Sequence, residues 1–151
     1  MKNITLTLKI ERAISELRRG GKVVISDPNS GTSVLLVAAE LIDKETVTKL
    51  SEFALSRPNI ILSNNRCNAI GLQIADQPCS ILIDKKWTMN DILSLCMPLT
   101  GHKIPTINGV VAESSKSIIS YSLLILRQTR LLPAGLMSII SKKKKKKINQ
   151  W

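Results

Sequence analysis

The chain has 151 residues, 44% of them hydrophobic, which is enough for one domain with an apolar core. Its four aromatic residues are too few for a nucleic-acid surface built on stacked rings. The formal net charge is +11, but six of the positive charges are the consecutive lysines Lys142–Lys147, and the remaining 16 basic and 11 acidic residues leave +5. A charge of that size is ordinary for a solvated surface, so we expect no specific nucleic-acid partner.

Strand patterns alternate with helix patterns along the chain. In the first half of the chain we expect a helix that ends at Gly20–Gly21, strands at 23–25 and 34–38, a helix over 47–54 and a strand at 59–63. A short helix at 64–71, a strand at 80–83 and a helix from Thr88 to Pro98 are expected to follow. The last elements expected are a strand at 107–111, the longest helix from Ser114 or Ser115 to about Arg130, and a strand at 136–140.

Local signals support three of these helices. Asp43 precedes the helix over 47–54 and is a predicted N-cap. The pair Thr88 and Asp91 has the spacing of a capping box. In the longest helix, apolar residues recur at helical spacing, and we expect their side chains to face the sheet: Ile118, Tyr121, Leu124 and Ile125.

The alternation predicts the fold class. We expect a single three-layer α/β domain over residues 6–140, with a mixed, twisted sheet flanked by helices. Residues 141–151 hold the lysine run, whose like charges repel, and are predicted to form a disordered basic tail.

The cysteines and the only histidine exclude several kinds of site. Cys67, Cys79 and Cys96 are far apart and odd in number, and His102 stands alone, so a zinc site is not expected. The first residues are too polar for a signal peptide, and no apolar run is long enough to span a membrane. We therefore expect a cytoplasmic protein with reduced thiols and no membrane association.

Four segments resemble a known enzyme family. They are Glu11–Gly20, Lys22–Asp27, Leu35–Leu41 and Leu131–Leu136. Together they are similar to 3,4-dihydroxy-2-butanone-4-phosphate synthase of riboflavin biosynthesis, and most of all to the degenerate copy of that domain fused ahead of GTP cyclohydrolase II in some bacteria. The resemblance implies a mixed sheet flanked by helices, and a homodimer with its sites at the subunit interface.

The polar residues of that family are absent from the matching positions. Its acidic, magnesium-binding loop is represented by Ser26–Ser33, in which Asp27 is the only carboxylate and has the setting of a turn residue. An ungapped count back from Leu132–Gly135 places Ile118, Ile119 and Ser120 where the family has His, Thr and Glu. Isoleucine neither binds magnesium nor transfers a proton, so we expect no metal and no cofactor.

Three residues remain as vestigial catalytic candidates: Asp27, Glu40 and His102. Gly101–Pro105 resembles the family's Gly-His-x-x-Pro segment, although a lone histidine is more often structural than a ligand. Cys67, beside Arg66, has no histidine base near it in the sequence and is interpreted as an unreactive thiol.

Three functions remain open. The first is a catalytically degenerate synthase-like domain that pairs with itself or with a GTP cyclohydrolase II domain, whose zinc-binding segment this sequence lacks. A lysine run is encoded by adenines, which favour slippage, so the fusion is hypothesised to be truncated by a frameshift. An intact downstream reading frame would support this hypothesis over a basic tail with its own role.

The second possible function is that of a weakly active, magnesium-dependent synthase acting on ribulose 5-phosphate. The third is a small basic nucleic-acid-binding protein, which would bind less tightly at higher salt.

Overall fold

A computed structural model describes residues 2–28, 30–55, 57–72, 76–112 and 117–141. The described residues form six strands: β1 (Lys22–Ser26), β2 (Ser33–Ala38), β3 (Asn59–Leu62), β4 (Cys79–Leu82), β5 (Val110–Ala112) and β6 (Ala134–Ile140). Their helices are α1 (Lys2–Arg18), the short 3-10 helix η1 (Ala39–Leu41), α2 (Lys44–Phe53), α3 (Asn64–Ala69), α4 (Met89–Cys96) and α5 (Ile118–Gln128).

The strands form one sheet in the order β1-β2-β6-β3-β4-β5. Every neighbouring pair is antiparallel, so the prediction of a mixed sheet is wrong. Alternation of strands and helices does not by itself determine strand direction. The β1–β2 connection is a tight turn, and α3, with six residues, is too short to carry the chain back along β3 before β4 begins.

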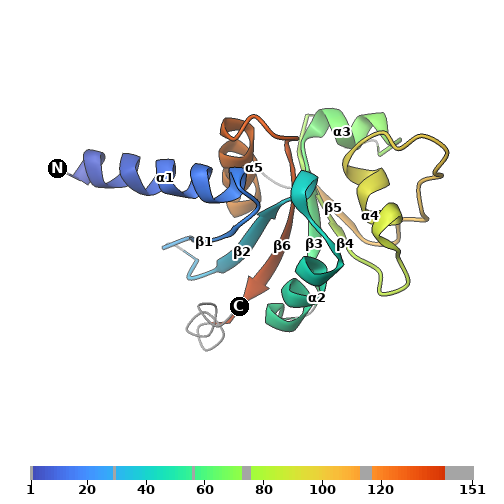
Figure 1. Ribbon diagram of the computed structural model, residues 1–151, viewed down its shortest axis with the longest axis horizontal. Coiled ribbons are helices and arrows are strands. Elements are labelled where there is room, and N and C mark those ends of the chain that lie inside the picture. Colours follow the sequence, from blue (N-terminus) through green and yellow to red (C-terminus); the bar gives the residue numbers. More distant parts are fainter. Residues whose placement is uncertain (1, 29, 56, 73–75, 113–116, 142–151) are drawn as a thin grey trace.

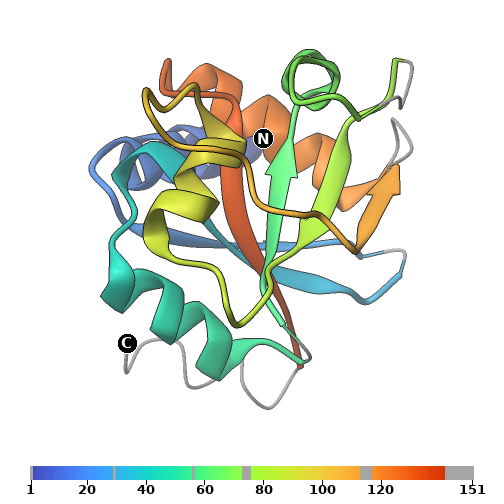
Figure 2. The same cartoon turned by 90° about the vertical axis from the view of Figure 1, so that its right-hand side faces the viewer.

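Two layers of helices enclose the sheet, as predicted. Figure 1 shows α1 and α5 on one side of the sheet and α2, α3 and α4 on the other, and in Figure 2 the latter three lie in front of the sheet. All six residues of β2 are buried, and successive side chains enter opposite cores because a strand alternates its faces. Leu35 and Val37 join the core beneath α2 and α4, while Val34 and Leu36 join the core beneath α1 and α5.

Helix α1 reaches well beyond the sheet at its amino end (Figure 1). Its last turns pack on the body, where Leu17 is fully buried and the Arg18 guanidinium donates to the Thr129 carbonyl oxygen at 3.2 Å. The helix ends where it was predicted to end, because Gly20 adopts a φ of 86° that most side chains would disfavour. It begins at Lys2 and, with 17 residues, is the longest helix of the described chain. The helix that ends near Arg130 was predicted to be the longest, but it has 11 residues.

Two elements begin about three residues later than predicted. Helix α5 begins at Ile118, and its N-cap is Ser117, whose Oγ accepts the Ser120 N–H at 3.1 Å; residues 114 and 115, the predicted caps, lie outside the described residues. Strand β5 covers 110–112 instead of 107–111.

The lysine run of the predicted basic tail, residues 142–147, also lies outside the described residues. None of the helices described has the length and apolar character needed to cross a bilayer.

Candidate functional site

Asp27 lies in the tight turn between β1 and β2. Its N–H donates to the Thr32 carbonyl oxygen at 2.8 Å, and its own carbonyl oxygen accepts the Gly31 N–H at 2.9 Å. The carboxylate accepts a hydrogen bond from the Ser30 hydroxyl at 2.9 Å. Gly31 has a φ of 73°, which closes the turn. Asp27 therefore shapes this turn through its main chain and its side chain together.

Glu40 lies at the opposite end of β2, in η1. Its Oε2 accepts the backbone N–H of Leu132 at 3.0 Å. This bond joins two of the segments that carry the family resemblance, 35–41 and 131–136. Because β2 has six residues, each advancing about 3.3 Å, Asp27 and Glu40 are separated by roughly 20 Å of strand.

His102 lies in the segment that follows α4. Its Nε2 is hydrogen-bonded to Asp91 Oδ1 at 2.9 Å, and both side chains are about three-quarters buried. Asp91 also accepts the Thr88 N–H, while Thr88 Oγ1 accepts the Asp91 N–H, so the predicted capping box is confirmed. The Thr88 N–H, together with His102, holds the pKa of Asp91 below its usual range. The hydrogen bond between His102 and Asp91 thus holds this segment against the start of α4.

The three vestigial candidates are not brought together. Asp27 and Glu40 lie at opposite ends of one strand, and His102 is bonded to α4 on the far side of the sheet from α5. Across the described ranges, no three His, Cys, Asp or Glu side chains are grouped so that they could hold a metal ion. Each candidate instead makes a hydrogen bond within the fold: Asp27 inside its turn, Glu40 to Leu132, and His102 to Asp91.

The start of α5 is packed as core at one of the positions matched to the family's polar segment. Ile119 is 8% exposed, whereas Ile118 and Ser120 are half-buried. The predicted sheet-facing set is wrong in part, because Tyr121 is 60% exposed and Leu124 is 51% exposed. The residues of α5 that are buried are Ile119, Ser122, Leu123 and Leu126.

We expect Ile119→Thr to lower the free energy of unfolding by about 1–3 kcal/mol, since it removes buried apolar volume and places a hydroxyl in the core. Denaturant titration measures the change. The control is Gln128→Thr, at an exposed position of the same helix, which should change stability by less than about 0.5 kcal/mol. An equal, small effect at both positions would contradict the burial of Ile119.

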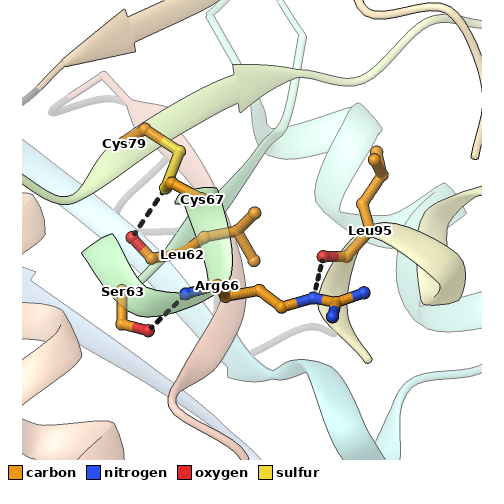
Figure 3. Close-up of a disulfide and its surroundings, with 6 residues drawn as sticks. All are labelled: Leu62, Ser63, Arg66, Cys67, Cys79 and Leu95. Carbon is orange, nitrogen blue, oxygen red and sulfur yellow. Dashed lines mark hydrogen bonds between the residues drawn. A yellow bond between two sulfur atoms is a disulfide. The ribbon is translucent and has the colours of Figure 1, made fainter. Parts of the chain in front are cut away.

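The largest difference between the structure and the sequence-based predictions concerns the cysteines. Cys67 of α3 and Cys79 of β4 are joined in a disulfide, so the prediction that all thiols are reduced is wrong (Figure 3). Both are fully buried, and no sequence spacing had indicated the pair. Cys96 remains free, and burial raises the pKa of its thiol to about 12, which leaves it unreactive.

Arg66 has a structural role beside the disulfide. Its guanidinium donates to the carbonyl oxygen of Leu95 at 2.9 Å, near the carboxyl end of α4 (Figure 3). It also donates to the carbonyl oxygen of Ser94 at 2.8 Å. Desolvation lowers the pKa of Arg66. The guanidinium satisfies carbonyl groups that a helix end leaves without partners, and it links α3 to α4.

Among the cavities on the described surface, two are lined by none of the three vestigial candidates. The first, of about 230 Å³, lies between α3 and α5 and includes Ser63, Asn64, Ser120 and Arg127. The second, of about 410 Å³, lies between α2 and the adjoining ends of β3 and β4 and includes Arg57, Asp84, Lys85 and Trp87. The sequence patterns did not indicate the second cavity, because its lining residues come from segments as far apart in the sequence as α2 and the turn before α4.

Comparison with known proteins gives a match at the level of structure. No family model matches the chain, and no curated protein matches it significantly. A two-domain 3,4-dihydroxy-2-butanone 4-phosphate synthase from A. baumannii is similar with a TM-score of 0.64 and 16% identity, over 89% of this chain. The match covers 48% of that protein, so the chain spans about half its length.

Single synthase structures are also similar. The enzyme from Candida albicans has a TM-score of 0.66 and 19% identity, over 89% of this chain and 81% of its own. A synthase in complex with two magnesium ions has a TM-score of 0.67 and 14% identity, over 87% of this chain and 74% of its own. The chain therefore has the fold of 3,4-dihydroxy-2-butanone 4-phosphate synthase.

Proposed function

We propose that this chain is a catalytically degenerate synthase-fold domain of the riboflavin-biosynthesis type, whose role is structural. The observation that carries the proposal is the separate placement of Asp27, Glu40 and His102, each of which makes a hydrogen bond within the fold. A magnesium-dependent sugar-phosphate reaction needs its carboxylates and its proton-transfer groups within reach of one substrate. Three groups held at three places do not meet that need.

The proposed role is pairing, either with a second copy of the chain or with a GTP cyclohydrolase II domain. Support comes from the outer face of α5, where Tyr121 and Leu124 expose more than half of their surface. Large apolar side chains side by side on a helix face are typical of a surface that another protein covers. Aromatic residues are also enriched in such surfaces.

We expect Tyr121→Ser/Leu124→Ser to weaken self-association by at least about tenfold, because it removes the exposed apolar area. Sedimentation equilibrium over a range of concentrations measures the dissociation constant. The control is Leu55→Ser, which removes an equally exposed leucine (61%) from the segment after α2 and should leave association unchanged.

Two results would count against the pairing role. One is a chain that stays monomeric at every concentration and also fails to bind an added cyclohydrolase II domain. The other is a loss of association with Leu55→Ser that equals the loss with Tyr121→Ser/Leu124→Ser, since the α5 face would then not be the surface.

A further inference from the structure

The β3–β4 ladder brings two cations to one cavity. Its regular register ends where Asn59 pairs with Leu82, and the Ile83 N–H then donates to the Pro58 carbonyl oxygen at 3.1 Å, which extends the pairing by one residue. Arg57 precedes Pro58, and Lys85 follows Ile83 by two residues, so the ladder sets the two cations on facing segments. Both line the cavity of about 410 Å³ beside α2.

These two positive charges are not neutralised by neighbouring acids. Ion pairs between described residues include Arg19 with Glu16, Lys49 with Glu52 and His102 with Asp91. Within the described ranges, neither Arg57 nor Lys85 takes part in such a pair. Among the described residues that line the cavity, Asp84 is the only one with a carboxylate, and its Oδ1 accepts the backbone N–H of Lys86 at 2.9 Å. Two cations and one acid leave the lining with one net positive charge.

Part of the cavity lining is apolar. Ile83 is 6% exposed and Ile92 is 2% exposed, and both belong to the core beneath α2 and α4. Trp87 also lines the cavity and packs partly against that core. Its backbone N–H donates to the Asp84 carbonyl oxygen at 3.1 Å, which holds the turn between β4 and α4. Because the two isoleucines are almost fully buried, the half-buried indole of Trp87 is the surface on which a flat ring can pack.

We propose that this cavity binds a small organic anion that carries an aromatic ring, with the ring against Trp87 and the anionic group held by Arg57 and Lys85. The volume lies in the range of small-molecule sites, which combine apolar walls with a few polar groups that orient the ligand. A simple inorganic anion would leave the apolar wall uncovered, and a neutral ring would leave both cations unpaired. The proposal is independent of the pairing role, because it uses none of the residues of α5.

The probe is 1-naphthyl phosphate, added to the whole chain and followed by amide chemical shifts. We expect saturable binding to one site, with the shifts centred on residues 83–87. Inorganic phosphate and neutral 1-naphthalenemethanol should each bind at least about tenfold more weakly, because each uses only half of the lining.

Variants separate this site from a general basic surface. Arg57→Gln, Lys85→Gln and Trp87→Leu should each weaken binding by roughly fivefold or more. The matched control is Lys86→Gln, since Lys86 is exposed and adjacent to Lys85 but does not line the cavity; its effect should stay below about twofold. The remaining amide shifts of each variant report whether it is folded, and Lys85→Gln changes an exposed side chain that no core contact requires.

Three outcomes would overturn the proposal. They are the absence of saturable binding by 1-naphthyl phosphate, equal losses for Lys85→Gln and Lys86→Gln, and inorganic phosphate binding as tightly as the aromatic probe. The second outcome would indicate a diffuse attraction to lysines, and the third an anion site that does not use the indole.

Discussion

Reducing the disulfide between Cys67 and Cys79 is expected to lower the free energy of unfolding by about 3 kcal/mol, because the bond closes a loop with a sequence separation of 12 and so restricts the unfolded chain. For a chain of 151 residues, that corresponds to a fall of roughly 6–12 °C in melting temperature. Melts with and without a phosphine reductant measure the difference. Alkylation under denaturing conditions counts the thiols before and after reduction.

Two variants are the controls for this experiment. Cys67→Ala/Cys79→Ala cannot form the bond, so its melting temperature should not respond to the reductant. Cys96→Ala keeps the disulfide and should respond as the parent does. The disulfide would be contradicted if the parent, without reductant, already showed three alkylated cysteines.

Gly135→Ala is expected to lower the free energy of unfolding by about 1–3 kcal/mol through overpacking. A Cβ at Gly135 would lie 2.7 Å from Leu126 Cδ1, 3.0 Å from Leu36 Cδ1 and 3.0 Å from the Val37 carbonyl oxygen. Both leucines are fully buried, so neither can turn away, and the carbonyl oxygen belongs to the neighbouring strand. Denaturant titration measures the loss.

Gly109→Ala is the matched control, because its added Cβ would meet only Leu82, at 3.3 Å or more, and should cost much less. Leu126→Ala should relieve part of the crowding, so the cost of Gly135→Ala is expected to be smaller in a Leu126→Ala background. An additive double variant, or equal costs at Gly109 and Gly135, would contradict close packing between α5 and β6.

The features that were predicted correctly from the sequence depend on neighbours within a few residues. Asp43 accepts the Thr46 N–H, and Thr88 exchanges hydrogen bonds with Asp91, as the capping patterns indicated. Such bonds form between a side chain and a main-chain group three residues away, so their residue types are visible in the sequence.

The errors arose where the outcome depends on distant parts of the chain. Helix α5 is apolar on nearly all sides, so its periodicity did not show that Ile119 and Leu126 face the sheet while Tyr121 does not. Strand directions depend on how each connection crosses the sheet. The disulfide depends on α3 being placed against the start of β4.

The candidate site was predicted in part. The sequence showed that the family's polar residues are missing from the matching positions, and it retained Asp27, Glu40 and His102 as remnants. It did not show what these residues do instead, because their partners Leu132 and Asp91 are recognisable only in the folded chain. The structure adds the contacts that give each remnant a role in local structure.

The most direct test of catalytic degeneracy is a synthase assay of the whole chain with ribulose 5-phosphate and magnesium. We expect product to form no faster than in buffer with magnesium alone, because no carboxylate cluster and no second histidine surround a common substrate position in the described chain. Magnesium-dependent turnover that is lost in Asp27→Asn, while the fold of that variant is retained, would contradict the account and identify the chain as an active synthase.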